Sequence, residues 1–188
     1  QGRLDGFGEG PEVGAGVQIA PNGVRALGRL GLMDRINTFA WRPNALVMRD
    51  AVDASDILRI PLGERFIERF DEAYRVIHRA DLLAVLLEAC KQNPRVRLET
   101  SARVVAVDDG PEVALHLADG RTLQGEILIG ADGLRSVVRQ TLIGDGAPRP
   151  PRYIVYRGVI PRSELPDDLW ESEVVMWTGP DADFVHYP

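Results

Sequence analysis

RVIHRADLLAVLLEACKQ, residues 75–92, holds a strand pattern that is followed directly by a helix pattern. The β-branched pair Val76-Ile77 predicts a short strand over Arg75–His78. Leucines then recur at the spacing of one helix face, which predicts a helix from about Ala80 to Gln92. Asn93-Pro94 ends this helix, because the residue before a proline disfavours helical backbone. A strand that leads straight into a helix is typical of an α/β domain.

On the N-terminal side of this unit, the pattern predicts a glycine-rich loop and a second strand–helix pair. A short buried strand is predicted over Val17–Ala20, and a helix begins at Pro21-Asn22. Gly31 lies where a helix C-cap would use glycine. Two further strands, Leu46–Arg49 and Ile57–Ile60, are separated by turn residues, which predicts a hairpin.

On the C-terminal side, strands dominate. Four predicted strands are followed by a helix at about Ser136–Leu142 and by a Gly/Pro-rich boundary at Gly144–Pro151. We expect an α/β domain over residues 1–150 and the start of a β-rich domain over 151–188. The predicted strands on this side are Val96–Glu99, Arg103–Asp108, Val113–Leu117, Ile127–Ile129, Tyr153–Ile160, Glu173–Trp177 and Phe184–Tyr187.

Composition excludes several classes of function. The 188-residue chain has a net charge of −6, and such an acidic surface argues against nucleic acid as a partner. No apolar run approaches the length of a membrane span. Cys90 is the single cysteine, so an internal disulfide is impossible and a reducing cytoplasm is expected. The sequence shows no metal-ligand spacing, and no metal is predicted.

The glycine-rich start does not fit a dinucleotide-binding loop. A G-x-G-x-x-G motif begun at Gly14 would place Ile19 where the third glycine belongs. Two interpretations stay open: a loop without a ligand, or a close approach of the backbone to a flat ligand at Gly14 and Gly16, where no side chain stands in the way.

Three other segments could carry chemistry, and two of them have a structural alternative. Arg79, at a strand-to-helix junction, suits an anionic ligand or a surface carboxylate. Asp132, in Gly130-Ala131-Asp132-Gly133, suits a helix cap or a sugar-like hydroxyl. Strand alternation places Asp183 and Tyr187 on one face and His186 on the other.

Taken together, the order and separation of these motifs resemble the single-component flavoprotein aromatic hydroxylases, most of all the branch of 3-hydroxybenzoate 6-hydroxylase and salicylate hydroxylase. The resemblance extends from about Val13 to Pro188. The segments that carry it are Val13–Asn22, His78–Leu82, Gly130–Gly133 with Ser136 and Arg139, Tyr156–Gly158, and Tyr187-Pro188.

The resemblance implies a partial FAD-binding domain of the p-hydroxybenzoate hydroxylase type, reduced by NADH or NADPH. It also implies O₂ as oxidant and a small phenolic substrate. The FAD-contacting positions would be Ala15, Gly16, Val17, Gln18, Arg79, Val104 and Asp132. Tyr187 would face the substrate, and Asp183 stands where relatives often have a histidine that helps to take the phenol proton. A carboxylate would repel the phenolate, so base catalysis by Asp183 needs a raised pKa.

Two segments of the family pattern are not found in the sequence: the N-terminal phosphate loop and the later Gly-Asp segment. We therefore expect a chain truncated at both ends. Two alternatives follow: an inactive fragment that folds without binding FAD, or a flavoprotein of the same fold that acts on a non-phenolic substrate. A homodimer is also open.

Overall fold

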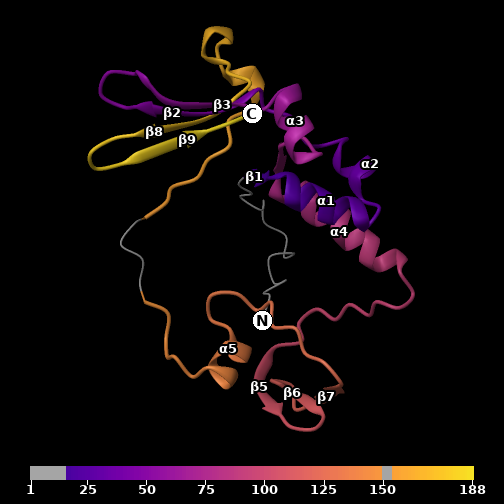
Figure 1. The fold of residues 1–188 in the computed structure, drawn as a ribbon. Helices are drawn as coiled ribbons and strands as arrows, with labels where there is room; N and C mark the ends of the chain where they lie inside the picture. Colours follow the sequence, from indigo (N-terminus) through magenta and orange to yellow (C-terminus); the bar gives the residue numbers. More distant parts are fainter. Residues whose placement is uncertain (1–15, 150–153) are drawn as a thin grey trace. The chain divides into compact units, whose positions relative to one another are not determined.

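The structure, a computed structural model, describes residues 16–149 and 154–188. The described chain forms two compact units. One contains residues 16–96 and 157–188, and the other contains residues 97–149 and 154–156. Both units are drawn in Figure 1. The domain division expected at residue 150 stays a prediction.

Strands β1 (Gly16–Ile19) and β4 (Arg75–His78) form an antiparallel pair in the first unit. The register sets Gly16 opposite His78 and Val17 opposite Ile77. On the other side of β4, the backbone of Trp41 bonds to that of Val76 in both directions, at 2.7 and 2.8 Å. Both strands were predicted from sequence, and both are confirmed.

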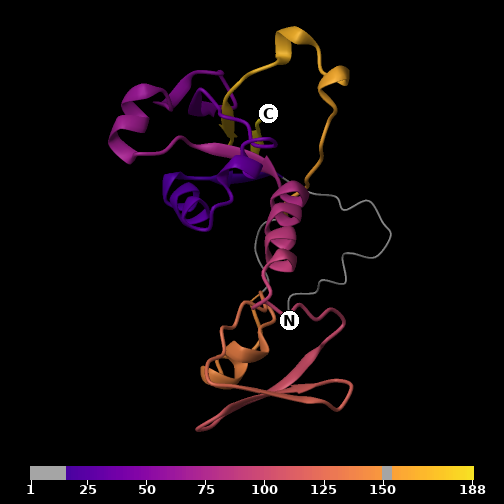
Figure 2. The same cartoon turned by 90° about the vertical axis from the view of Figure 1, so that its right-hand side faces the viewer.

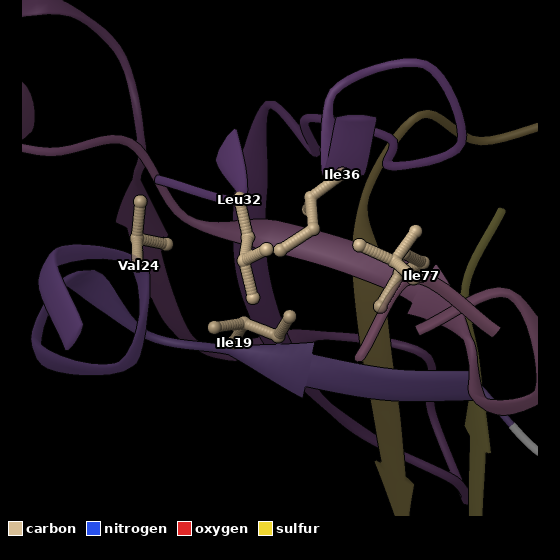
Figure 3. Packing of buried hydrophobic residues seen from close by; sticks show 6 residues of the cluster. Ile19, Val24, Leu32, Ile36 and Ile77 are labelled. Carbon is tan, nitrogen blue, oxygen red and sulfur yellow. The ribbon is translucent and has the colours of Figure 1, made fainter. Parts of the chain in front are cut away.

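Helices α1 (Pro21–Arg29), α2 (Met33–Ile36) and α4 (Arg79–Gln92) surround this pair of strands. Their apolar side chains meet those of the strands in one core, part of which is shown in Figure 3. Fully burying an aliphatic side chain of this size contributes about 1.5–3 kcal/mol, so this core stabilises the β1–β4 pair. The core residues are Ile19, Val24, Leu32, Ile36, Ile77 and Val85.

The C-terminus of α1 confirms the predicted glycine cap. Gly31 has a φ of +71°, which favours glycine because other residues rarely adopt it. Its N–H donates to the Gly28 carbonyl at 2.9 Å, and the Leu32 N–H donates to the Leu27 carbonyl at 3.2 Å. These two bonds form a Schellman motif, which reverses the chain and brings Leu32 into the core.

A four-stranded sheet in the order β3–β2–β8–β9 completes the first unit (Figure 1). Strands β2 (Ala45–Asp50) and β3 (Asp56–Pro61) form the predicted hairpin. Strand β8 (Val174–Thr178) joins β2 in parallel, and β9 (Asp183–His186) follows β8 in an antiparallel hairpin. The remaining elements are α3 (Glu64–Phe70) and two 3₁₀ turns, η2 (Arg162–Glu164) and η3 (Asp167–Leu169).

The second unit contains a three-stranded antiparallel meander of β5 (Val104–Asp109), β6 (Val113–Leu117) and β7 (Thr122–Gly125). Helix α5 (Val137–Leu142) contacts β5, and Figure 2 shows this orange helix beside the sheet. The predicted turn at Asp119-Gly120 is confirmed, with a φ of +87° at the glycine.

Three predicted strands are wrong in this structure. Residues 96–99, 127–129 and 154–160 have no strand assignment among the described residues. Ile127 and Ile129 are 83% and 84% exposed. Their β-branched composition favours extended backbone, but a strand also needs a neighbouring strand, and within the described residues no strand pairs with them.

Candidate functional site

Two predicted site residues from opposite ends of the chain meet in the first unit. The Tyr187 hydroxyl, just beyond β9, donates to the Gly16 carbonyl of β1 at 2.9 Å. A β-carbon at residue 16 would stand 2.2 Å from Cε2 of the Tyr187 ring. Glycine is therefore required by the close approach of an aromatic ring, and the ring belongs to the chain itself.

A second hydrogen bond lies one step along β1. The Tyr74 hydroxyl, directly before β4, donates to Oε1 of Gln18 at 2.6 Å. Burial raises the pKa of Tyr74, and the nearby Tyr187 raises it further. Sequence reasoning gave Tyr74 no role, although strand register could have indicated it. Because Gln18 pairs with Val76, a side chain two residues before Val76 lies diagonally across from Gln18.

Arg79 lies at the same end of the β1–β4 pair as Gly16. Because Gly16 pairs with His78, the next residue, Arg79, starts α4 beside the first residue of β1. Arg79 is an exposed residue, and the α4 N-terminus adds a partial positive charge. The structure thus brings together five of the predicted residues: Gly16, Val17 and Gln18 of β1, Arg79 and Tyr187. Ala15 lies outside the described residues.

Asp183 does not lie beside the hydroxyl of Tyr187. It starts β9, where it pairs with Thr178, and it is exposed. Tyr187 lies four positions further along the chain, which corresponds to about 13 Å of extended backbone. The role predicted for Asp183 therefore stays a prediction.

Val104 and Asp132 belong to the second unit. Val104 opens β5 opposite Leu117. The Asp132 carboxylate accepts from the N–H groups of Val137 at 2.7 Å and Val138 at 3.3 Å, and from the Ser136 hydroxyl. The helix-cap alternative for Asp132 is thus realised. A contact between either residue and FAD stays a prediction.

The two glycines of the Gly-Ala-Asp-Gly motif have separate structural reasons. A β-carbon at Gly130 would stand 2.8 Å from Cγ1 of Val138, so a side chain there would displace α5. Gly133 has a φ of +74°, which favours glycine. The motif shapes a turn that holds Asp132 beneath the first turn of α5.

The residues around β1 fit a flat, partly anionic ligand such as FAD. Arg79 offers a planar set of donors that matches phosphate. At Gly16 the Tyr187 ring of the chain itself occupies the space where a β-carbon would stand. Because Oε1 of Gln18 accepts from Tyr74, the amide is oriented with its NH₂ group as the remaining donor. Within the described residues, no group of three or more His, Cys, Asp or Glu side chains could hold a metal ion.

The fold defines the class: a mixed α/β chain that is similar to part of solved FAD-binding hydroxylases. A family model described as Lycopene cyclase protein matches residues 45–181, more than half of the chain. The chain belongs to the family that this model describes. It is also similar to aromatic hydroxylases and monooxygenases.

Individual relatives narrow the class. The chain is 40% identical over 178 residues to 3-hydroxybenzoate 6-hydroxylase 1 of Aquipseudomonas alcaligenes, covering 94% of this chain and 45% of that protein. It is 39% identical to 3-amino-4-hydroxybenzoate 2-monooxygenase of Streptomyces cremeus, covering 94% and 44%. The chain thus spans about half the length of the curated relatives it matches.

Solved structures agree at the level of the fold. The crystal structure of Klebsiella pneumoniae HpxO complexed with FAD and uric acid superposes with a TM-score of 0.69 at 24% identity. It covers 95% of this chain, which corresponds to 45% of that protein. In residues 16–149 and 154–188, no helix combines the length and apolar composition needed to cross a membrane.

Proposed function

We propose that this chain is part of an FAD-dependent monooxygenase that hydroxylates a phenolic aromatic acid with NADH or NADPH and O₂. The observation that carries the proposal is the Tyr187–Gly16 hydrogen bond of 2.9 Å. It joins the strand expected to face the substrate to the strand expected to run along the flavin. The proposed substrate class is also supported by relatives whose names state hydroxybenzoate and aminohydroxybenzoate as substrates.

Residues of the first unit would each have a separate role in binding FAD. FAD, when bound, supplies the oxygen-transfer chemistry that no side chain can provide. The backbone of Gly16 and Val17 would lie along the flavin, the Gln18 amide would donate to a ring edge, and Arg79 would pair with an anionic group.

Tyr187 would orient the substrate. Its O–H donates to the Gly16 carbonyl, so the lone pairs of its oxygen remain to accept a hydrogen bond from a phenol O–H. An acceptor at this point increases electron density on the phenol ring, which an electrophilic oxygen-transfer reaction needs. A cytoplasmic location and a homodimer remain predictions.

The test is substrate-stimulated NADH and NADPH oxidation by the longer protein that contains this chain, with a panel of hydroxybenzoates. We expect at least one phenolic acid to stimulate oxidation and to be hydroxylated. Tyr187→Phe should lower product formed per nicotinamide oxidised. Tyr156→Phe, at a tyrosine that is 91% exposed, is the matched control. The proposal fails if no hydroxybenzoate stimulates oxidation.

A second candidate is a chain that folds without retaining FAD. The observation that favours it is the engagement of both Asp132 carboxylate oxygens in capping α5. An absorbance spectrum of the desalted chain after incubation with FAD decides between the two. A flavin band at a one-to-one ratio, reduced in Arg79→Ala, contradicts this candidate. A colourless chain supports it.

A further inference from the structure

Four side chains close a ring of interactions on one face of the four-stranded sheet. Nη1 of Arg49 bonds to the Glu171 carboxylate at 2.9 and 3.2 Å, and its guanidinium lies over the Trp177 ring at 5.2 Å. Nε1 of Trp177 donates to Nε2 of His186 at 3.1 Å. The same Nε2 lies 3.9 Å from Glu171 Oε2, which completes the ring. We call these four residues the His186 cluster.

Strand register explains why these residues meet. Arg49 pairs with Trp177 across β2 and β8, so their side chains share a face. His186 pairs with Val175, two residues before Trp177, and therefore lies on the same face. Its neighbour Tyr187 points to the opposite face, toward β1. Two neighbouring residues are thus held on opposite faces: His186 by Trp177, and Tyr187 by Gly16.

The hydrogen bond from Trp177 to His186 depends on the protonation state of the imidazole. The indole N–H can only donate, so Nε2 of His186 must accept, and the neutral imidazole carries its proton on Nδ1. A second proton would convert Nε2 into a donor. The Trp177 bond is then lost, and Glu171, already 3.9 Å away, becomes the natural partner. One nitrogen therefore has two alternative partners, selected by its protonation.

We propose that His186 is a positioning residue for Tyr187: its bond from Trp177 holds the end of β9 so that the Tyr187 hydroxyl reaches Gly16, and protonation shifts His186 to Glu171 and releases that hydroxyl. The part of this inference that concerns substrate orientation rests on the proposed function. The structural link between His186 and Tyr187 does not.

The surroundings of His186 favour the neutral, bonded state. Burial lowers the pKa of His186, and the Arg49 charge also lowers it, while the Glu171 carboxylate raises it. Arg49 is bound in turn to Asp56 of β3 at 3.1 Å, and the Phe184 ring stacks on the imidazole at a centroid distance of 5.5 Å. At neutral pH the bond between Trp177 and His186 is therefore formed. Acidification below the ordinary histidine range protonates His186 and breaks this bond.

The test follows two signals in the chain by NMR: the Trp177 indole N–H and the Tyr187 ring. As the pH falls from about 8 to about 5, a range that spans histidine titration, both signals should shift with the same midpoint. His186→Gln supplies a side-chain oxygen that accepts from Trp177 but cannot titrate. We expect this variant to keep the neutral-pH Tyr187 signal and to lose most of its pH-dependent shift.

Matched variants keep the result interpretable. Trp41→Phe, at an indole that donates to Ser172 instead, assigns the indole signals and should leave the pH dependence of the Tyr187 ring signal unchanged. Trp177→Phe should move the Tyr187 signal at neutral pH toward its acidic position. The inference is overturned if Tyr187 does not follow the His186 midpoint, or if His186→Gln retains the full shift. None of these readouts needs FAD or turnover, so failure of the proposed function would be recognised separately.

Discussion

The Tyr187 ring lies so close to Gly16 that a β-carbon at residue 16 would stand 2.2 Å from Cε2 and 2.8 Å from the hydroxyl oxygen. Both atoms belong to a side chain whose ring cannot bend, and the hydroxyl is also bound to the Gly16 carbonyl. The smallest side-chain change at residue 16 must therefore move either β1 or Tyr187. At the residue scale, this contact and the Tyr74–Gln18 bond define the candidate site.

Gly16→Ala should lower the free energy of unfolding by about 1–3 kcal/mol, the range typical of overpacking a close contact. Urea denaturation monitored by circular dichroism would measure it. Gly158→Ala, in the same unit, is the control and should change stability little, because an added β-carbon there would meet nothing within 4 Å. Equal stability of Gly16→Ala and the parent would show that the Tyr187 ring is not held at Gly16.

Tyr74→Phe removes a hydroxyl that donates to Gln18 at 2.6 Å. Loss of this bond should cost about 0.5–1.5 kcal/mol of stability. Because burial raises the pKa of Tyr74, its ionisation should lie above the ordinary tyrosine range. Ultraviolet titration of tyrosinate should therefore lose its most alkaline step in Tyr74→Phe and keep that step in Tyr156→Phe. The same most alkaline step in both variants would contradict the assignment.

At the scale of elements, α5 depends on a cap that precedes it by several residues. Asp132 accepts from two N–H groups of the first turn, and Ser136 accepts from the Arg139 N–H at 2.9 Å. A helix of six residues is too short to be stable through its own hydrogen bonds. Capping and contact with β5 must therefore hold it.

Asp132→Ala should destabilise the second unit by about 0.5–2 kcal/mol, the usual cost of losing a helix cap. Amide hydrogen exchange across Val137–Leu142, measured without FAD, would report it as faster exchange in α5. Glu126→Ala removes an exposed carboxylate of the same unit and serves as control. Unchanged exchange in Asp132→Ala would mean that the carboxylate serves α5 little and is available to a ligand.

At the scale of the whole molecule, three histidines are present, and His186 has a lowered pKa because of burial. The unfolded chain then takes up a proton at a higher pH than the folded chain. As the pH falls through the ordinary histidine pKa of about 6.5, the unfolded state gains protons first, and the free energy of unfolding decreases. The decrease ends once the pH lies below the folded-state pKa of His186.

We therefore expect the free energy of unfolding to fall less in His186→Gln than in the parent between about pH 7.5 and about pH 5. The two losses should differ by about 1.4 kcal/mol for each unit by which folding lowers the pKa of His186. Urea unfolding at both pH values measures it. His116→Gln, at a partly exposed histidine bound to Asp108, is the control for general histidine effects. Parallel pH profiles for His186→Gln and the parent would refute a buried, neutral His186.

Much of the local structure follows from the sequence alone, since its causes lie within a few residues. Leucine spacing after His78 was enough to predict α4, and Gly31 was enough to predict the cap of α1. The ordered motifs also sufficed to predict the flavoprotein family. The predicted strand at Ile127–Ile129 failed because composition favours extended backbone but does not supply a partner strand.

The sequence by itself thus determined the local elements, the order of the motifs and the class of protein. Only the tertiary structure decided that Tyr187 reaches Gly16 across 171 residues, that Tyr74 holds Gln18, and that His186 joins Trp177 to Glu171. The physical reason is that periodicity and turn chemistry act between near neighbours. A hydrogen bond between distant residues depends on strand register and on the direction of each side chain, which exist only once the sheets have formed.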